Sequence, residues 1–202
     1  MLRLVNDILQ AKGLMLRTGT AVDATLISAP SSTKNVEGQR DPEMKQTKKG
    51  NNWYFGMKAH IGVDAASGLV HTVVGTSANV NDLNVAGQLL HGQEYAAFGD
   101  AGYQGVHKRP EAAGPAWHVA MRPGLRRQLN PFIEPEFIAE RVEKMKASIR
   151  AKVEHPFRVV KRQFGFTKVR YRGLAKNTAQ IITLFALSNL WMARRPLMEA
   201  QG

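Results

Sequence analysis

Three acidic residues stand in sequence surroundings that are otherwise apolar or helix-forming. Asp23 lies within AVDATLI, Asp100 ends YAAFGD just before a glycine turn, and Glu154 lies within RAKVEHPF. An ionised carboxylate in apolar surroundings costs several kcal/mol unless a cation or hydrogen bonds compensate it. The three acids are therefore candidates for chemistry, although a capped turn or a surface position would also explain each of them separately.

Three carboxylates that a fold brings together are suited to holding two divalent cations about 4 Å apart. One cation would lower the pKa of a water or hydroxyl nucleophile, and the other would stabilise the leaving oxygen of an in-line displacement at a phosphodiester. This chemistry needs no covalent side-chain nucleophile. It therefore suits a chain without cysteine, for which thiol nucleophiles, disulfides and cysteine-ligated zinc are excluded.

Basic residues surround the third acid with helical spacing. Arg150, Glu154 and Lys161 form the pattern R-x3-E-x6-K, and on a helix they would lie within about 40° of one another. Arg158 lies close to the same face. Such cations would place phosphate-binding groups beside a metal ligand, although a solvated stripe of charges has the same pattern. Pro156 removes one helical hydrogen bond and predicts a bend.

The chain is strongly basic, with 28 Lys and Arg against 16 Asp and Glu and a net charge of +12. A surplus of this size concentrates polyanions at the surface, so nucleic acid is the first partner to consider and an anionic membrane the second. Two segments, KQTKK and RPGLRR, are the best candidates for phosphate contacts that do not read sequence. Their basic residues are Lys45, Lys48, Lys49, Arg122, Arg126 and Arg127.

No apolar run reaches the roughly 20 residues that a bilayer span requires. The longest, at 181–193, covers thirteen residues, and Asn6 and Asp7 interrupt the N-terminal segment before a secretion signal could form. The sequence therefore predicts a cytoplasmic protein without a membrane partner.

The elements that must position the acids follow from hydrophobic periodicity and turn residues. Residues 1–16 predict a short amphipathic helix, and residues 29–52 predict a long exposed loop. Strands are predicted over 19–28, 53–64, 69–77, 95–100 and 117–121, with a compact turn at 65–68 that makes the second and third a hairpin. A helix is predicted from Asn81 or Asp82 to about His91, and the last third is mostly helical. This order predicts an α/β fold, a mixed sheet covered by helices.

Four blocks of this sequence resemble bacterial insertion-sequence transposases of the DDE class, most closely the insertion-sequence-five group. They are VDATLI around Asp23, QTKKGNNWYFGMKAHIGVDAASGLVHTV at 46–74, GDAGYQG around Asp100, and R-x3-E-x6-K around Glu154. The resemblance extends from about residue 3 to residue 195. It implies an RNase H-like mixed β-sheet flanked by helices, with the first two acids at strands and the third on a later helix.

The resemblance also implies the roles of the residues. Asp23, Asp100 and Glu154 match the three catalytic acids that bind two Mg²⁺ ions, for which Mn²⁺ can substitute. Arg150 and Lys161 match the basic positions of the signature, which contact DNA near the cleaved phosphate. The implied reaction is hydrolysis at the ends of an insertion sequence and then attack of the freed 3′-OH on target DNA. The implied partners are double-stranded DNA and further copies of the chain, in the bacterial cytoplasm at the nucleoid.

Two departures from the family pattern affect these expectations. The broader signature has a tyrosine three residues before the arginine, where this chain has Ala147. Family members also carry a helical region before the first strand, where this chain has some twenty residues. We therefore expect residues 1–18 to be a remnant of that region and residues 19–196 to be the catalytic domain. The alternatives are a truncated, inactive remnant that only binds DNA, and a nuclease of the same fold without strand transfer.

Overall fold

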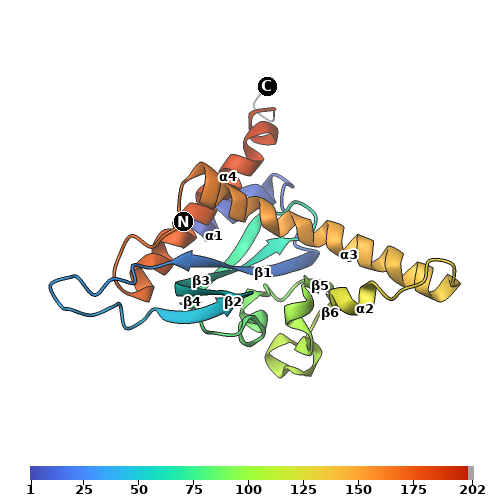
Figure 1. Ribbon diagram of the computed structural model, residues 1–202. Helices are drawn as coiled ribbons and strands as arrows, with labels where there is room; N and C mark the ends of the chain where they lie inside the picture. Colours follow the sequence, from blue (N-terminus) through green and yellow to red (C-terminus); the bar gives the residue numbers. More distant parts are fainter. Residues whose placement is uncertain (200–202) are drawn as a thin grey trace.

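The computed structural model describes residues 1–199, which form a six-stranded sheet with helices on both faces (Figure 1). The strands are β1 (Gly19–Ser28), β2 (Lys45–Lys49), β3 (Asn52–Asp64), β4 (Val70–Ser77), β5 (Ala96–Gly99) and β6 (Ala116–Val119). The helices are α1 (Leu2–Ala11), α2 (Pro123–Arg126), α3 (Glu134–Arg158), the π-helical η6 (Val159–Gln163) and α4 (Leu174–Glu199). Short 3₁₀ turns are η1 (Asp82–Asn84), η2 (Ala86–Leu89), η3 (Ala101–Tyr103), η4 (Val106–Lys108) and η5 (Pro110–Ala112).

The sheet is mixed, as the sequence predicts. The central strand β1 pairs antiparallel with β3 and parallel with β5, and β5 pairs parallel with β6. The predicted hairpin is confirmed, because β3 and β4 pair antiparallel across the turn at 65–68. The strands predicted over 19–28, 95–100 and 117–121 are confirmed as β1, β5 and β6.

The two edges of β1 are paired over different lengths. β3 pairs with β1 from Thr20 to Ser28, whereas β5 reaches only from Gly19 to Ala21. Beyond that point the β5 side of β1 is open until Ser28, which bridges to Lys168. Residues 22–27 of β1 therefore lie at a gap in the sheet, where residues 23–26 are partly exposed while Val22 and Ile27 remain buried.

Apolar side chains cover the two faces of the sheet with different partners. One face packs against α3 and α4, with Met57, Ile61, Val153, Phe157 and Phe185 in a single cluster. The other packs against the 3₁₀ turns through a second cluster, Val22, Val85, Leu89, Tyr103 and Val106. Burial of each such side chain contributes about 1.5–3 kcal/mol, so α3 is held firmly over the open edge of β1.

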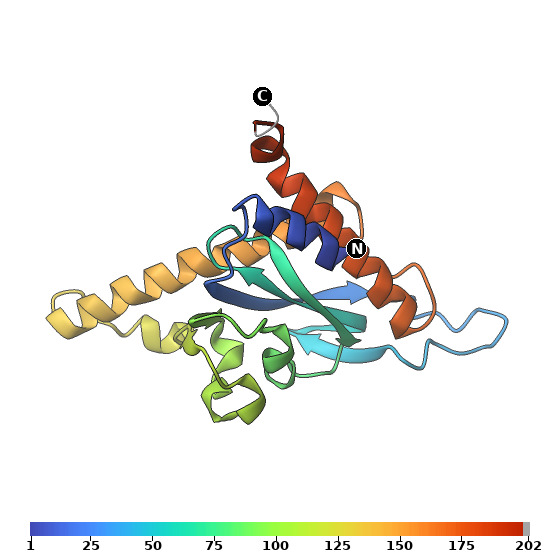
Figure 2. The same cartoon turned by 180° about the vertical axis from the view of Figure 1, so that it is seen from behind.

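The predicted N-terminal helix is confirmed as α1, which lies beside α4 (Figure 2). Leu2, Val5 and Leu9 pack with Ala186 and Ala193 of α4. This contact is apolar and extensive, which explains why a helix of only ten residues is stable. The predicted division of the chain at residue 18 remains a prediction.

The helix predicted from Asn81 or Asp82 to about His91 is wrong in type. The segment forms two 3₁₀ turns, η1 and η2, and Asn81 caps the first by accepting a hydrogen bond from the backbone N–H of Leu83. The neighbouring turn η5 approaches so closely that a Cβ on Gly87 would lie 1.9 Å from the carbonyl oxygen of Glu111. This close packing favours short turns over one regular helix.

The predicted loop at 29–52 is also partly wrong, because residues 45–49 form β2. This strand pairs antiparallel with β3 from Asn52 to Gly56 across a two-residue turn, in which Gly50 has φ +60°. β2 is exposed except for Thr47. It therefore lacks the apolar alternation that marks a half-buried strand in a sequence.

Candidate active site

The structure brings the three predicted acids together at the gap in the sheet. Asp23 extends from the open part of β1, Asp100 follows the last residue of β5, and Glu154 lies on α3. All three line one pocket of about 730 Å³, which we call the α3 pocket. Asp100 comes close because β5 ends just where the open stretch of β1 begins.

A tight turn fixes Asp100. Its Oδ1 accepts a hydrogen bond from the backbone N–H of Gly102 at 2.8 Å and so caps η3. A Cβ on Gly102 would lie 2.9 Å from that same oxygen, and one on Gly99 would lie 2.9 Å from the Tyr103 ring. The glycines of GDAGY therefore allow the carboxylate and the aromatic ring to pack against the backbone.

Asp23 carries an unfavourable charge in this arrangement. Burial, and to a lesser degree the negative charges of Asp100 and Glu154, raise its pKa to about 6. The backbone N–H of Ala24, 2.7 Å from Oδ1, and the Arg150 guanidinium oppose this rise. A bound cation would remove the repulsion among the three carboxylates.

The carboxylate oxygens of the three acids are ligands of the type that hard divalent cations bind. Carboxylate oxygens are the ligands that Mg²⁺ prefers, and this ion keeps several waters while binding one or two carboxylates. Among residues 1–199, no three acidic or histidine side chains lie close enough to form a ready-made metal cluster. The α3 pocket therefore offers carboxylates that converge on one space rather than an assembled cage.

The basic residues of R-x3-E-x6-K face the same pocket. Arg150, Arg158 and Lys161 line it together with the acids, and Lys161 donates from Nζ to the carbonyl oxygen of Leu26 at 3.0 Å. Burial, and to a lesser degree the charge of Lys49, lower the pKa of Lys161. This lysine is thus anchored to the open edge of β1.

The bend predicted at Pro156 takes a specific form. The α-helical part of α3 continues past Pro156 to Arg158, and the chain then widens into the π-helical turn η6. Wide turns of this kind are frequent at functional sites. Lys161 lies within η6 and still lines the pocket.

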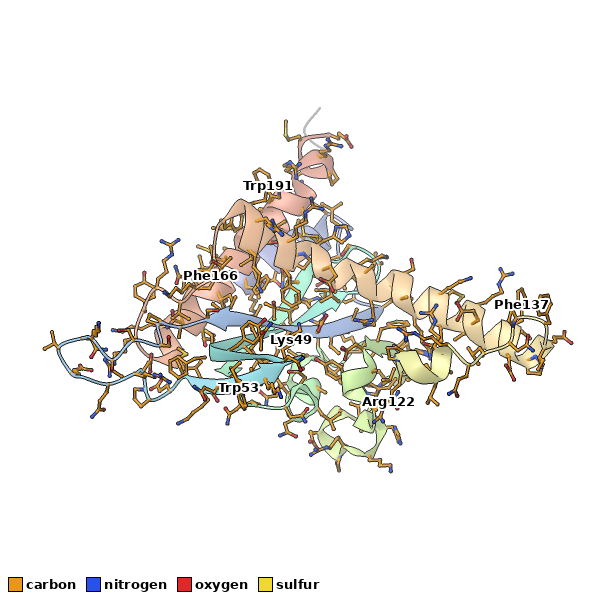
Figure 3. The ribbon with its side chains drawn as sticks, viewed as in Figure 1. Lys49, Trp53, Arg122, Phe137, Phe166 and Trp191 are labelled. Atoms are coloured by element: carbon orange, nitrogen blue, oxygen red, sulfur yellow. The ribbon has the colours of Figure 1, made fainter. Side chains whose placement is uncertain are left out.

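The two predicted phosphate-binding segments differ in their relation to the acids. Lys49 lines the α3 pocket, and Lys48 lines an adjoining smaller one, whereas Lys45 is exposed on β2. Figure 3 shows Lys49 near the centre of the molecule, beside the open stretch of β1, and Arg122 towards α2. β2 therefore brings one segment to the site.

The RPGLRR segment lies beside the site rather than in it. Arg122 precedes α2, and Arg126 and Arg127 line a separate pocket of about 410 Å³. Arg126 donates two hydrogen bonds to Glu140, at 2.9 and 3.0 Å. This ion pair compensates the charge of Arg126, so Arg122 and Arg127 are the cations of this segment that have no such pairing among residues 1–199.

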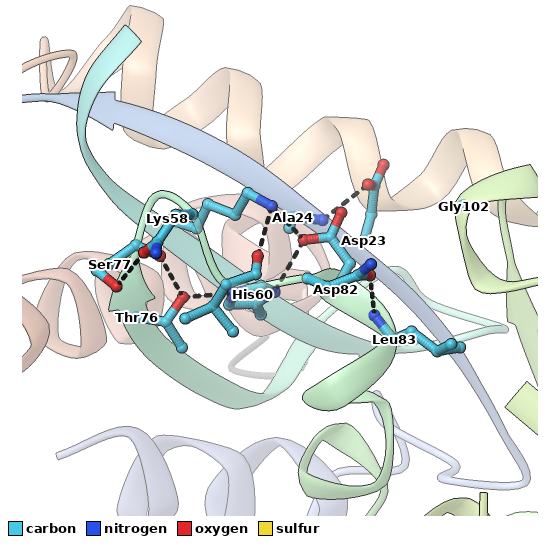
Figure 4. A network of polar contacts seen from close by, with 12 residues as sticks. Asp23, Ala24, Lys58, His60, Thr76, Ser77, Asp82, Leu83 and Gly102 are labelled. Atoms are coloured by element: carbon cyan, nitrogen blue, oxygen red, sulfur yellow. Dashed lines mark hydrogen bonds and ion pairs between the residues drawn. The ribbon is translucent and has the colours of Figure 1, made fainter. Parts of the chain in front are cut away.

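A polar network next to the acids was missed by the sequence analysis. Lys58 on β3 donates from Nζ to Oδ1 of Asp82 at 2.9 Å and to the carbonyl oxygen of Val80 at 2.8 Å (Figure 4). The ring of His60 lies within hydrogen-bond distance of the Thr76 hydroxyl, at 2.8 Å. Burial lowers the pKa of His60 to about 4, so the ring is neutral.

Lys58 and Asp82 line a second pocket, of about 240 Å³, which we call the β2 pocket. Asp23 and Asp100 line both this pocket and the α3 pocket. The signal in the sequence was a lysine within the apolar strand FGMKAHIGV. Its partner could not be read from the sequence, because Asp82 is distant along the chain.

The sheet and the site together define a class of protein. Three acids and several cations meet at the open edge of the central strand of a mixed α/β sheet, an arrangement suited to a polyanionic substrate. Residues 15–190 match the family described as the transposase DDE domain. This match covers most of the chain, which therefore belongs to the DDE transposase domain family. No solved structure gives a significant match to the chain.

Membership of this family confirms the coarser predictions. The fold is the RNase H-like sheet of DDE transposases, and the family implies DNA as the partner, a transposase or nuclease activity, and a divalent metal. The narrower insertion-sequence-five group remains a prediction. Within residues 1–199, no helix has both the length and the apolar character that crossing a membrane would require.

Proposed function

We propose that this chain is the catalytic domain of a DNA transposase that cleaves insertion-sequence ends and joins them to target DNA. The observation that supports this proposal most is the composition of the α3 pocket. Three carboxylates from separate parts of the sequence line it, and so do five cations. The cations are Lys49, Arg150, Arg158, Lys161 and Arg162.

The carboxylates would hold the metal. Asp23, Asp100 and Glu154 are the residues proposed to bind two Mg²⁺ ions, or Mn²⁺ in their place. Bound divalent ions would activate the attacking oxygen and stabilise the negative charge that develops at phosphorus. The rise in the pKa of Asp23 supports this assignment, because the carboxylate is placed where a cation would be favourable.

The cations would position the phosphate. Arg150 lines the pocket, and its guanidinium would bind the phosphate oxygens there. Lys161 uses one of its three ammonium donors on Leu26. Lys49, Arg158 and Arg162 complete the basic rim of the pocket. Phosphate contacts of this kind fix the register of DNA without reading its sequence.

The proposal extends to partners and location. The net charge of +12 favours double-stranded DNA as the partner, both the insertion-sequence ends and the target. We propose that the protein acts on this DNA at the bacterial nucleoid in the cytoplasm. Joining two ends requires at least two copies of the chain on DNA. Binding should weaken steeply with rising salt, because Lys and Arg contacts release counterions. A flat response to salt would contradict DNA as the partner.

The test is cleavage of a supercoiled plasmid in Mg²⁺ or Mn²⁺, followed by joining of a pre-cleaved oligonucleotide end to plasmid. Wild type should nick and join, and Asp100→Asn should lose both by at least about 100-fold. Asp7→Asn, an exposed acid on α1, is the control and should retain both. Nicking without joining would identify a nuclease. DNA binding without either reaction in wild type would favour the remnant that only binds DNA.

A further inference from the structure

The β2 pocket adjoins the α3 pocket along β1, and Asp23, Ala24, Thr25, Lys49 and Asp100 line both. α3 lies along one side of β1, and β2 with η1 lies along the other, in both views of the molecule (Figures 1 and 2). Glu154 lines only the α3 pocket, whereas Asp23 and Asp100 line both. Two of the proposed metal ligands therefore lie where these two adjoining pockets meet.

Lys58 is the most constrained cation of the β2 pocket. Its side chain is 15% exposed, and two of its three ammonium donors are used on Asp82 and on the carbonyl of Val80. Oδ1 of Asp82 also lies 3.5 Å from Nδ1 of His60. The conformational entropy of this long side chain is therefore lost on folding rather than on binding. One donor remains for a ligand.

The geometry of phosphoryl transfer allows the α3 pocket and the β2 pocket to hold different strands. In an in-line displacement the attacking and leaving oxygens lie on opposite sides of phosphorus. Hydrolysis forms a bond from the water oxygen to phosphorus and breaks the bond to the 3′ oxygen of the insertion-sequence end. A water proton leaves to solvent, and the 3′ oxygen takes up a proton. The phosphate thus stays on the flanking strand, which departs and is replaced by target DNA for joining.

We propose that the β2 pocket binds the strand on the 3′ side of the scissile phosphate, and that Lys58 is a positioning residue that donates its third N–H to a phosphate of that strand. This strand is the flank during cleavage and the target during joining. The inference rests on the proposed function. The α3 pocket is about three times larger and carries more cations, so it suits the end that must be held through both reactions. The smaller pocket suits the strand that is exchanged.

The test compares two oligonucleotide substrates, one with a flank of several nucleotides and one with a flank of a single nucleotide. Lys58→Met should cleave the long-flank substrate about tenfold more slowly than wild type and the short-flank substrate equally fast. Truncating the flank should therefore slow wild type but not the variant. Lys58→Arg, which retains the charge, should restore the preference for a long flank, a response that a merely structural role would not produce.

Lys146 offers a matched control. Its Nζ also contacts one carbonyl oxygen, of Val119, and one carboxylate, of Glu143, and its side chain is 19% exposed. It does not line the β2 pocket. Lys146→Met should therefore keep the wild-type dependence on flank length. Circular dichroism of each variant would show that loss of the buried cation has not unfolded the protein.

Two results of the cleavage assay would overturn the inference. Equal slowing of Lys58→Met on both substrates would assign Lys58 to the structure of the site, and no slowing on either would show that the strand lies elsewhere. If wild type cleaves neither substrate, the proposed function fails. The binding of the two uncleaved substrates then tests separately whether the β2 pocket holds the flank. Fluorescence anisotropy in Ca²⁺ should show tighter binding of the long flank to wild type but not to Lys58→Met, and equal binding by wild type would overturn it.

Discussion

Two carboxylates next to β1 have opposite surroundings. Glu94 is buried, and its oxygens accept hydrogen bonds from the Thr20 hydroxyl at 3.0 Å and from the backbone N–H groups of His91 at 2.9 Å and Gly92 at 2.6 Å. Burial alone would raise the pKa of Glu94. The hydrogen bonds and the nearby His91 ring outweigh burial and hold the pKa below its usual value.

Asp23, three positions along β1 from Thr20, has little of this compensation. It accepts a hydrogen bond from the adjacent Ala24 N–H, and it faces two other carboxylates. Its pKa is therefore raised to about 6, mainly by burial. Asp64, the last residue of β3, resembles Glu94, because its oxygens accept hydrogen bonds from Arg17 and Ser67.

The difference separates carboxylates that stabilise the fold from those that are available for a ligand. A buried acid whose oxygens already accept three hydrogen bonds is compensated without a metal and contributes to stability. A partly buried acid that faces like charges destabilises the free protein and gains from a cation. Burial of an acid is common to both cases. The hydrogen-bond partners are what distinguish them, and four measurements test this distinction.

Catalysis should show the largest difference. Asp23→Asn should lower the rate of plasmid nicking in Mg²⁺ by at least about 100-fold, because an amide cannot replace a carboxylate as a ligand of a hard cation. Glu94→Gln, the same chemical change in the other acid, should leave the rate per folded molecule within about threefold of wild type. Comparable losses in both variants would remove the distinction.

Stability should respond to Glu94→Gln with the next largest effect. The amide places an NH₂ group against donors that now bond a carboxylate, so we expect the free energy of unfolding to fall by about 2–3 kcal/mol. Urea denaturation at pH 7.5 measures this loss. The loss should shrink in acid, because protonation removes the charge of Glu94 in wild type once the pH falls through its lowered pKa. An unchanged midpoint would contradict the structural role.

Asp23→Asn should change stability in the opposite direction. Since the pKa is about 6 in the fold and 3.8 ordinarily, the folded state holds the proton more tightly than the unfolded chain. The stability contributed by Asp23 therefore decreases as pH rises from about 4 to about 6. At pH 7.5 without metal, the variant should be more stable than wild type by about 1–3 kcal/mol.

The pH dependence is the control for that gain. At pH 4, Asp23 is protonated in the folded state and close to half protonated in the unfolded chain, so most of the difference between the variant and wild type should have disappeared. A gain that persists undiminished at pH 4 would show that packing rather than charge is responsible. A loss of stability at pH 7.5 would contradict the raised pKa of Asp23.

The sequence predicts the parts of this site that depend on local pattern. β1, β3 and β4 are buried and rich in apolar and β-branched residues, so their periodicity marks them. Asp23 and Asp100 are recognisable because each interrupts or ends an apolar run. Arg150 and Glu154 are recognisable because they lie four residues apart on a helix that continues through both.

The rest depends on contacts between distant segments. The pair of Lys58 and Asp82 requires β3 and η1 to be adjacent, and the ion pair of Arg126 and Glu140 requires α2 to lie against α3. The exposed strand β2 is specified by the free edge of β3 rather than by its own composition. None of these interactions has a signal within a short stretch of sequence.

Metal binding should give the smallest effect and the most direct comparison of the two acids. A ligand that binds only the folded state at ten times its dissociation constant stabilises it by about 1.4 kcal/mol. We expect Mg²⁺ to raise the unfolding free energy of wild type and of Glu94→Gln by this amount, but that of Asp23→Asn by much less. The measurement is thermal unfolding at pH 7.5 with ionic strength held constant by NaCl, since screening alone would also relieve repulsion among the carboxylates. Because Asp23→Asn already lacks that repulsion, an equal gain in all three proteins would place the metal away from Asp23.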